Sequence, residues 1–310
     1  MDYKVGDKLT PNPDSWHLVS NLIFLESPAG VGYSYNLDTA FEYNDAVTAN
    51  DTYNALLHFF QLYPEYAKNK FFIAGESYAG KYIPDLAVLI DKNSAKYKFP
   101  LAGILVGNGL MTFDTLEESE IEFVIKKELV DPEIIPLYEK YCKKDFESDG
   151  CQTFLEKYDK DTDGLNPYAI YDYCYSSERI EGKEVSKQKK VYLTQEDILN
   201  KLKDQFAPKR NYNFRNGDSS APCAYFDGIF NYFNLNGKAY HAKFDGMQWN
   251  GPCADNITYN ADADGSIESY KYLISRKINI VLYNGNADAV VPYIDTYKGM
   301  NLLKVYPISP

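Results

Sequence analysis

The sequence predicts an α/β fold in which a mostly parallel sheet is interrupted by a long insertion. Through the first ~110 residues, short apolar runs alternate with segments of helical periodicity. This alternation returns only at residues 277–283, and the part in between is polar and weakly periodic. We therefore expect a first part of the core over residues 1–114, an insertion over 115–235 and a second part of the core over 236–310.

Apolar runs bounded by turn residues are the expected strands, at residues 21–25, 70–74, 101–106 and 277–283. A helix is expected over residues 41–63, because apolar side chains recur there at spacings of three and four. Pro64 follows this helix and helps to end it. A second helix is expected over residues 78–90, and residues 115–150 are predicted to be helical and acidic.

The net charge excludes one class of partner. The chain has 310 residues, with 32 Lys and Arg against 44 Asp and Glu, which gives a formal net charge of −12. A surface this acidic repels phosphate backbones, so nucleic acid is excluded as the main partner. No stretch approaches the ~18 uncharged apolar residues that a membrane span needs, so no membrane partner is expected. The 45% hydrophobic and 25% charged content is ordinary for globular proteins and excludes wholesale disorder.

The five cysteines are widely spaced, and no two of them form a C-x-x-C pair. This spacing disfavours a zinc ribbon or a thioredoxin-type site, and it is typical of disulfides in an exocytoplasmic protein. The three histidines are also scattered, so no metal is expected. The first eight residues are polar and do not resemble a signal peptide. Cysteines of this kind without an export signal predict that the chain is incomplete.

The strongest chemical signal is the run Gly75-Glu-Ser77-Tyr-Ala79-Gly80, which follows an expected strand and opens an expected helix. This is the context of a nucleophile elbow, a tight turn that lifts a serine hydroxyl clear of the sheet. The turn requires small residues two positions before and after the serine, and Gly75 and Ala79 meet that requirement. The backbone N–H of Tyr78 would then face a developing oxyanion. The alternative is an ordinary turn in which Ser77 caps the helix.

A serine nucleophile needs a base, and the base needs an acid that orients it. Asp288 follows the last expected strand, at the carboxyl end where α/β sheets place catalytic groups, and is the candidate acid. The alternative is a loop aspartate that caps the next helix. In this arrangement the base follows the acid along the chain, yet His17, His58 and His241 all precede Asp288. His58 lies within the first expected helix and is expected to be a partly buried structural residue.

Several motifs together resemble the serine carboxypeptidase family. They occur in the family's order and spacing, at Glu26-Ser-Pro-Ala-Gly-Val-Gly-Tyr-Ser-Tyr35, Gly75-Glu-Ser-Tyr-Ala-Gly80, Gly107-Asn-Gly109, Asn166-Pro-Tyr168 and Tyr283-Asn-Gly285 with Asp288. The resemblance covers almost the whole chain and is weakest across residues 180–220. It implies an α/β-hydrolase fold with a helical lid insertion. It also implies release of C-terminal residues from peptides at acid pH, without a cofactor, in lysosomes, vacuoles or secretions.

The resemblance implies roles for four residues. Ser77 matches the nucleophile, Asp288 the triad acid and Tyr78 a backbone oxyanion donor. Glu76 matches a carboxylic acid that binds the terminal carboxylate of the substrate. Two bare carboxylates repel each other, so such a contact needs a shared proton and therefore acid conditions. The alternative for Glu76 is an acid favoured by the N-terminus of the following helix.

Both ends of the chain depart from the family's pattern. The chain lacks the Asn-Gly-Gly-Pro-Gly-Cys-Ser-Ser loop of the family, and Asp14-Ser-Trp16 matches a segment normally downstream of it. The chain also stops before the family's histidine-bearing segment, and Asn286 stands where the family usually has Asp. We therefore expect a chain that is incomplete at both ends and inactive alone, because loss of the base costs on the order of 10⁶ in turnover. An acyltransferase of the same family and a non-catalytic binding or protective protein are the alternatives.

The resemblance also implies a pattern of disulfides. Cys142 would pair with Cys151, and Cys174 with Cys223. Cys253 matches the family cysteine whose partner lies in the absent loop, so it would remain unpaired. Four cysteines allow three connectivities, so this pairing is one of three.

Two sequons and one acidic motif complete the candidates. Asn50-Asp-Thr52 and Asn256-Ile-Thr258 are glycosylation sequons, and Asn256 is favoured because Asn50 falls in an expected helix. Residues 159–164 match the opening of a calcium-binding EF-hand loop, but its twelfth position is Ile170 instead of Glu. An acidic surface turn is expected there instead.

Overall fold

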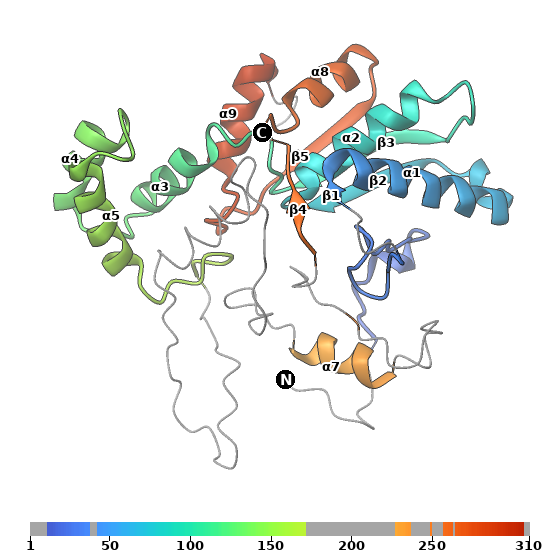
Figure 1. The fold of residues 1–310 in the computed structure, drawn as a ribbon, viewed down its shortest axis with the longest axis horizontal. Helices are drawn as coiled ribbons and strands as arrows, with labels where there is room; N and C mark the ends of the chain where they lie inside the picture. Colours follow the sequence, from blue (N-terminus) through green and yellow to red (C-terminus); the bar gives the residue numbers. More distant parts are fainter. Residues whose placement is uncertain are drawn as a thin grey trace.

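The computed structural model describes residues 11–37, 42–171, 227–236, 249, 257–262 and 264–306. Within this part of the chain, a parallel sheet packs against helices, and a further group of helices lies to one side of it (Figure 1). None of the described helices combines the length and the apolar character that crossing a membrane requires.

The sheet has three parallel strands in the order β2-β3-β5. They span Phe71–Glu76, Leu101–Gly107 and Asn279–Tyr283. In this register Ile73, Ile104 and Ile280 are neighbours on one face of the sheet. Three of the four strands expected from the sequence are thus confirmed.

Three helices cover this face of the sheet: α1 (Asp45–Leu62), α2 (Ala79–Lys92) and α8 (Ile267–Ser275). The expected helices at 41–63 and 78–90 correspond to α1 and α2. Helix α1 begins at Asp45 because the side chain of Asn44 caps it, accepting a hydrogen bond from the N–H of Val47 at 2.8 Å. The short 3-10 helix η2 (Pro64–Lys68) follows α1.

The prediction of a strand at residues 21–25 is wrong. This segment follows a short 3-10 helix, η1 (Trp16–Leu18), and pairs with none of the described strands. Its side chains lie largely in solvent, with Phe24 88% exposed. An apolar run becomes a strand only where a neighbouring strand forms hydrogen bonds with it and another element packs against its apolar side chains. The run itself determines neither condition.

A second apolar core is built from α3 (Leu116–Lys126) and the segments that follow it. These segments are η3, α4, η4 and α5, at Pro132–Ile134, Ile135–Leu137, Tyr138–Cys142 and Asp149–Thr162. The prediction that residues 115–150 are largely helical is confirmed. Helix α9 (Tyr293–Leu303) packs against both α3 and α8. The remaining elements are α7 (Asp227–Asn236) and a short parallel pair, β1 (Tyr43–Asn44) with β4 (Tyr259–Asn260).

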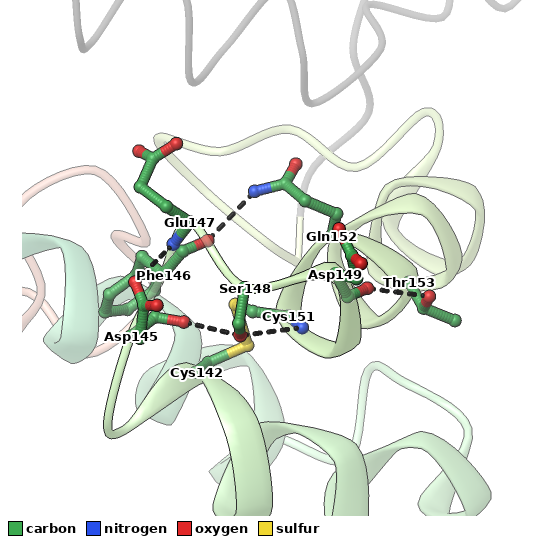
Figure 2. Close-up of a disulfide and its surroundings, with 9 residues drawn as sticks. All are labelled: Cys142, Asp145, Phe146, Glu147, Ser148, Asp149, Cys151, Gln152 and Thr153. Carbon is green, nitrogen blue, oxygen red and sulfur yellow. Dashed lines mark hydrogen bonds between the residues drawn. A yellow bond between two sulfur atoms is a disulfide. The ribbon is translucent and has the colours of Figure 1, made fainter.

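A disulfide joins Cys142, at the end of η4, to Cys151 in the first turn of α5 (Figure 2). Both cysteines are buried. The side chain of Ser148 caps α5 and accepts a hydrogen bond from the N–H of Cys151. The disulfide between Cys142 and Cys151 confirms one of the pairs that the family resemblance implies. The other cysteines lie outside the described residues: Cys174, Cys223 and Cys253.

Gly80 lies in the first turn of α2, against the chain that leaves β3. A Cβ atom at this position would collide with the backbone of Leu110 and Gly109. We expect Gly80→Ala to lower the free energy of unfolding by about 2–3 kcal/mol, because backbone atoms cannot move aside as the end of a side chain can. Chemical denaturation measures this loss. Gly285→Ala is the matched control, since the nearest atom to its added Cβ is Asn108 Oδ1 at 3.7 Å. Equal losses in the two variants would contradict the close contact.

Candidate active site

Ser77 occupies a sharp turn between β2 and α2. Its φ is 60°, in the left-handed region that residues other than glycine rarely adopt. Its N–H donates to the carbonyl oxygen of Gly107 at 3.1 Å, and its own carbonyl accepts from the N–H groups of Gly80 and Leu110 at 2.9 and 3.0 Å. These bonds hold the strained turn against the end of β3. Ser77 itself remains partly exposed.

The turn leaves room only for small neighbours. A Cβ atom at Gly75 would collide with the Cβ of Ala79, so the geometry requires glycine at position 75. The alternative in which Ser77 caps the helix is not supported, because the N-cap residue of α2 is Tyr78 and no side-chain hydrogen bond caps this helix. The turn has the form expected of a nucleophile elbow.

Asp288 lies in the loop after β5, beyond the carboxyl edge of the sheet. Its Oδ1 accepts a hydrogen bond from the N–H of Val290 at 2.9 Å. Its Oδ2 accepts from the N–H of Val291 at 3.3 Å and from Nδ2 of Asn108 at 3.0 Å. Burial raises the pKa of Asp288, and these three hydrogen bonds offset part of the rise. The helix-cap alternative is not supported, because the N-cap residue of α9 is Pro292.

Asn108 links the Asp288 loop to the end of β3, a role that sequence analysis did not assign to it. The residue is buried and has a φ of 38°. Besides its bond to Asp288, its Nδ2 donates to the carbonyl oxygen of Val291 at 3.1 Å. Its Oδ1 accepts from the N–H of Gly285 at 2.8 Å. The sequence offered two signals: its place between two glycines at the end of an expected strand, and its place in a motif that resembles the family. Neither indicates a particular side-chain contact.

Glu76 is the last residue of β2 and directly precedes the serine. It keeps much of its surface in solvent. Partial loss of hydration, followed by the nearby negative charge of Asp288, raises the pKa of Glu76. The raised pKa keeps the protonated, hydrogen-bond-donating form to a higher pH than in an exposed glutamate.

A buried carboxylate that sequence analysis also missed anchors the side chain of Tyr78. Asp45, the first residue of α1, accepts from the Tyr78 hydroxyl at 3.1 and 3.2 Å. It also accepts from the Tyr259 hydroxyl at 2.8 Å and from the N–H of Asp262 at 2.7 Å. The carboxylate thereby joins the starts of α1 and α2 to the β4 segment. No local pattern could have identified it, because these donors lie 33, 214 and 217 residues away.

Two of the three histidines lie in the described part of the chain. His17 in η1 and His58 on α1 are both exposed. The expectation that His58 is partly buried is therefore wrong. The buried side of α1 includes Leu56 and Phe60, and a residue two positions from each points away from that side. His241 lies outside the described residues.

The remaining candidates are structural or lie beyond the described part. Asn50 is exposed on α1, and its side chain donates to the carbonyl oxygen of Ala46, whereas Asn256 falls outside the described residues. The acidic motif expected to be a surface turn is mostly the last part of α5. Its Asp161 accepts a hydrogen bond from the N–H of Asp131 at 2.8 Å. Among the described residues, no group of three or more histidine, cysteine or acidic side chains is arranged to hold a metal ion.

Comparison with known proteins identifies similar chains. A family model described as serine carboxypeptidase matches residues 2–308. The lysosomal protective protein of Mus musculus is 32% identical over 303 residues, which cover 91% of this chain and 62% of that protein. Serine carboxypeptidase 1 of Hordeum vulgare is 32% identical over 316 residues, which cover 92% of this chain and 62% of that protein.

A solved structure is also similar. The crystal structure of Kex1(delta)p, a prohormone-processing carboxypeptidase from Saccharomyces cerevisiae, matches with a TM-score of 0.59 at 19% sequence identity. The match covers 90% of this chain and 59% of the yeast chain. The present chain thus spans less than two thirds of the length of each of these three proteins.

Proposed function

Because the chain belongs to the serine carboxypeptidase family and has the α/β-hydrolase fold, we propose that it carries the nucleophile of a peptidase that releases C-terminal amino acids. Ser77 is that nucleophile. The observation that carries the proposal is the strained turn, which holds Ser77 at a φ of 60° beyond the carboxyl edge of a parallel sheet. The loop of Asp288 leaves the same edge.

In the proposed reaction, the Ser77 hydroxyl oxygen attacks the carbonyl carbon of the last peptide bond while a base takes its proton. The backbone N–H of Tyr78 stabilises the oxyanion that forms. The base then gives its proton to the departing amine, which leaves an acyl group on Ser77 that water hydrolyses. Asp288 orients the base. Its three hydrogen bonds support this role, because an orienting acid must itself be held in place.

Glu76 is proposed to bind the terminal carboxylate of the substrate. A protonated Glu76 can donate a hydrogen bond to that carboxylate, whereas an ionised Glu76 repels it. Since the pKa of Glu76 is raised, the protonated form persists to a higher pH than in an exposed glutamate. Binding should therefore weaken as the pH rises through that pKa, and acid working conditions follow.

The proposed reaction also needs a base. Among the described residues, neither His17 nor His58 is hydrogen-bonded to Ser77 or Asp288. We therefore propose that the isolated 310-residue chain has negligible peptidase activity, since loss of the base costs on the order of 10⁶ in turnover. A non-catalytic binding or protective role is the second candidate, and this lack of a placed base favours it.

The proposed substrates are peptides with a free C-terminus, and the proposed setting is the lysosome, the vacuole or the secreted fraction. The disulfide between Cys142 and Cys151 supports an oxidising compartment. The name of the mouse relative, lysosomal protective protein, supports the same setting.

Labelling with a fluorophosphonate, with and without added imidazole, tests the proposed function. We expect the chain alone to react slowly, because the Ser77 hydroxyl keeps its proton, and imidazole to accelerate the reaction by acting as the base. Rapid labelling without imidazole would show that the chain supplies its own base, and it would contradict the proposal of negligible activity. No labelling under either condition would contradict the proposal that Ser77 is the nucleophile. With imidazole present, hydrolysis of a blocked dipeptide separates a peptidase from an acyltransferase, which would instead use a glucose ester and an alcohol acceptor.

A further inference from the structure

Two acidic side chains are enclosed where α3 packs against α9. Glu120 on α3 is 7% exposed, and Asp295 on α9 is fully buried. One oxygen of Asp295, Oδ1, accepts hydrogen bonds from the hydroxyls of Thr115 and Ser119 at 2.6 and 3.4 Å. The other oxygen, Oδ2, and Oε1 of Glu120 are buried without a hydrogen-bond partner among the described residues. An ionised carboxylate with an unpaired oxygen is costly in such a place.

The charged groups around this pair are mostly acidic. The acids on α3 and in the loop before α9 are Glu117, Glu118, Glu122 and Asp288. Tyr158 on α5 faces Glu120, and Tyr138 in η4 lies near the other α3 acids.

Two lysines approach the same contact. Lys298 on α9 forms ion pairs with Glu118 and Glu122 at 2.7 and 2.9 Å. Lys126 on α3 lies over the ring of Tyr293. The charge of Lys298 is thus divided between two partly exposed acids, and it neutralises the buried pair only in part.

The packing of α3 against α9 opposes ionisation of both buried acids. Burial raises the pKa of Asp295 to about 6, although its two hydroxyl donors and Lys298 act in the opposite direction. Burial, with the negative charges of Glu117, Asp295 and Asp288, raises the pKa of Glu120 well above its ordinary value. Each charge also makes the other harder to form, so the two groups titrate as a coupled pair.

We propose that the contact between α3 and α9 depends on protons: it is tight while Glu120 and Asp295 are protonated, and it loosens as a rising pH ionises them. Protonation removes the repulsion between the two helices and makes each unpaired oxygen cheaper to bury. The loop of Asp288 leads directly into α9, which begins at Tyr293, so loosening of α9 also releases that loop. The inference rests on helix packing and is independent of the proposed peptidase activity.

The direction of the pH effect follows from linkage between protonation and folding. In the unfolded chain both carboxyls have ordinary pKa values of about 4. In the folded chain both pKa values are higher. The folded state therefore binds protons that the unfolded state releases. The resulting stabilisation is complete below the unfolded pKa and is lost as the pH rises through the folded pKa, which for Asp295 is about 6.

Thermal unfolding of the 310-residue chain at about pH 5 and about pH 7.5 tests the proposal. We expect the unfolding temperature to be roughly 3–6 °C higher at the lower pH. Asp295→Asn keeps an acceptor oxygen for Thr115 and Ser119 and removes one charge, and Glu120→Gln removes the other. Each variant should reduce the difference between the two pH values, and the double variant should reduce it most. Glu156→Gln, at an exposed position on α5, is the matched control and should leave the difference unchanged.

Two results would overturn the proposal. One is an unaltered chain that unfolds at the same or a higher temperature at about pH 7.5 than at about pH 5. The other is a double variant that keeps the full difference measured for Glu156→Gln. If the substitutions prevent folding, infrared spectroscopy of the unaltered chain decides instead, because protonated carboxyl groups absorb apart from carboxylates. We expect the protonated band to weaken between about pH 5 and about pH 7.5, and a band of equal intensity at the two pH values would refute the proposal.

Discussion

Replacement of Ser77 by alanine is expected to abolish covalent labelling of the chain by a fluorophosphonate, both with and without imidazole. The probe bonds to an activated serine oxygen, and alanine has none at this position. Triad residues act as a unit, and covalent labelling requires the serine oxygen itself, so this is expected to be the largest effect of any single substitution on labelling. The mass of the intact protein before and after treatment measures the adduct directly.

The fold should survive this substitution. Serine and alanine have the same backbone restrictions at a φ of 60°, and the bonds that hold the turn come from the backbone of residue 77. The unfolding temperature of Ser77→Ala should therefore match that of the unaltered chain. Ser94→Ala, at an exposed position after α2, is the control and should label normally. An adduct on Ser77→Ala would show that the reactive group lies elsewhere, and the assignment of Ser77 as the nucleophile would be wrong.

Local patterns predicted the parts of this molecule that local chemistry dictates. Strands β2, β3 and β5 were visible as apolar runs, and α1 and α2 as repeats at three and four residues. The elbow was visible for a similar reason, because its small residues, Gly75 and Ala79, stand at fixed positions from Ser77. Each of these features is determined by residues within a few positions of one another along the chain.

The features that were missed depend on contacts between distant parts of the chain. Asn108 and Asp288 are 180 residues apart, and only the sheet brings the ends of their strands together. Asp45 meets Tyr78 because α1 packs against α2, a contact that neither helix reveals alone. The strand predicted at residues 21–25 is wrong for the same reason, since its local pattern was suitable but none of the described strands pairs with it.

Asn108→Ala is expected to lower the free energy of unfolding by roughly 3–5 kcal/mol, the second large effect. The substitution removes the amide that donates to Asp288 and leaves the N–H of Gly285 without its acceptor. A partly buried carboxylate and a backbone donor thus lose partners together. Alanine also tolerates a φ of 38° less well than asparagine does. Chemical denaturation measures the loss, and imidazole-dependent labelling of Ser77 should fall in parallel.

Asn93→Ala is the matched control for this substitution. Asn93 follows α2, is partly buried, and its side chain makes one hydrogen bond, to the carbonyl oxygen of Leu89 at 2.9 Å. Its loss should cost about 1 kcal/mol and leave labelling of Ser77 unchanged. Similar losses for the two variants would mean that Asn108 is an ordinary turn residue and does not hold Asp288.

Asn108→Asp separates the effect of charge from the effect of backbone shape, because aspartate tolerates the same left-handed conformation as asparagine. At about pH 7.5 the new carboxylate replaces a donor that lies 3.0 Å from Oδ2 of Asp288, so two negative charges share one partly buried site. At about pH 4.5 one proton can be shared between them, which restores a donor. The folded variant then binds a proton that the unfolded chain binds less tightly. Its deficit in the free energy of unfolding, relative to the unaltered chain, should therefore be large at the higher pH and smaller at the lower pH. Measuring the deficit against the unaltered chain at each pH cancels the separate contribution of Glu120 and Asp295. An equal deficit at both values would show that position 108 acts through its shape, and the donor role assigned to its amide would be wrong.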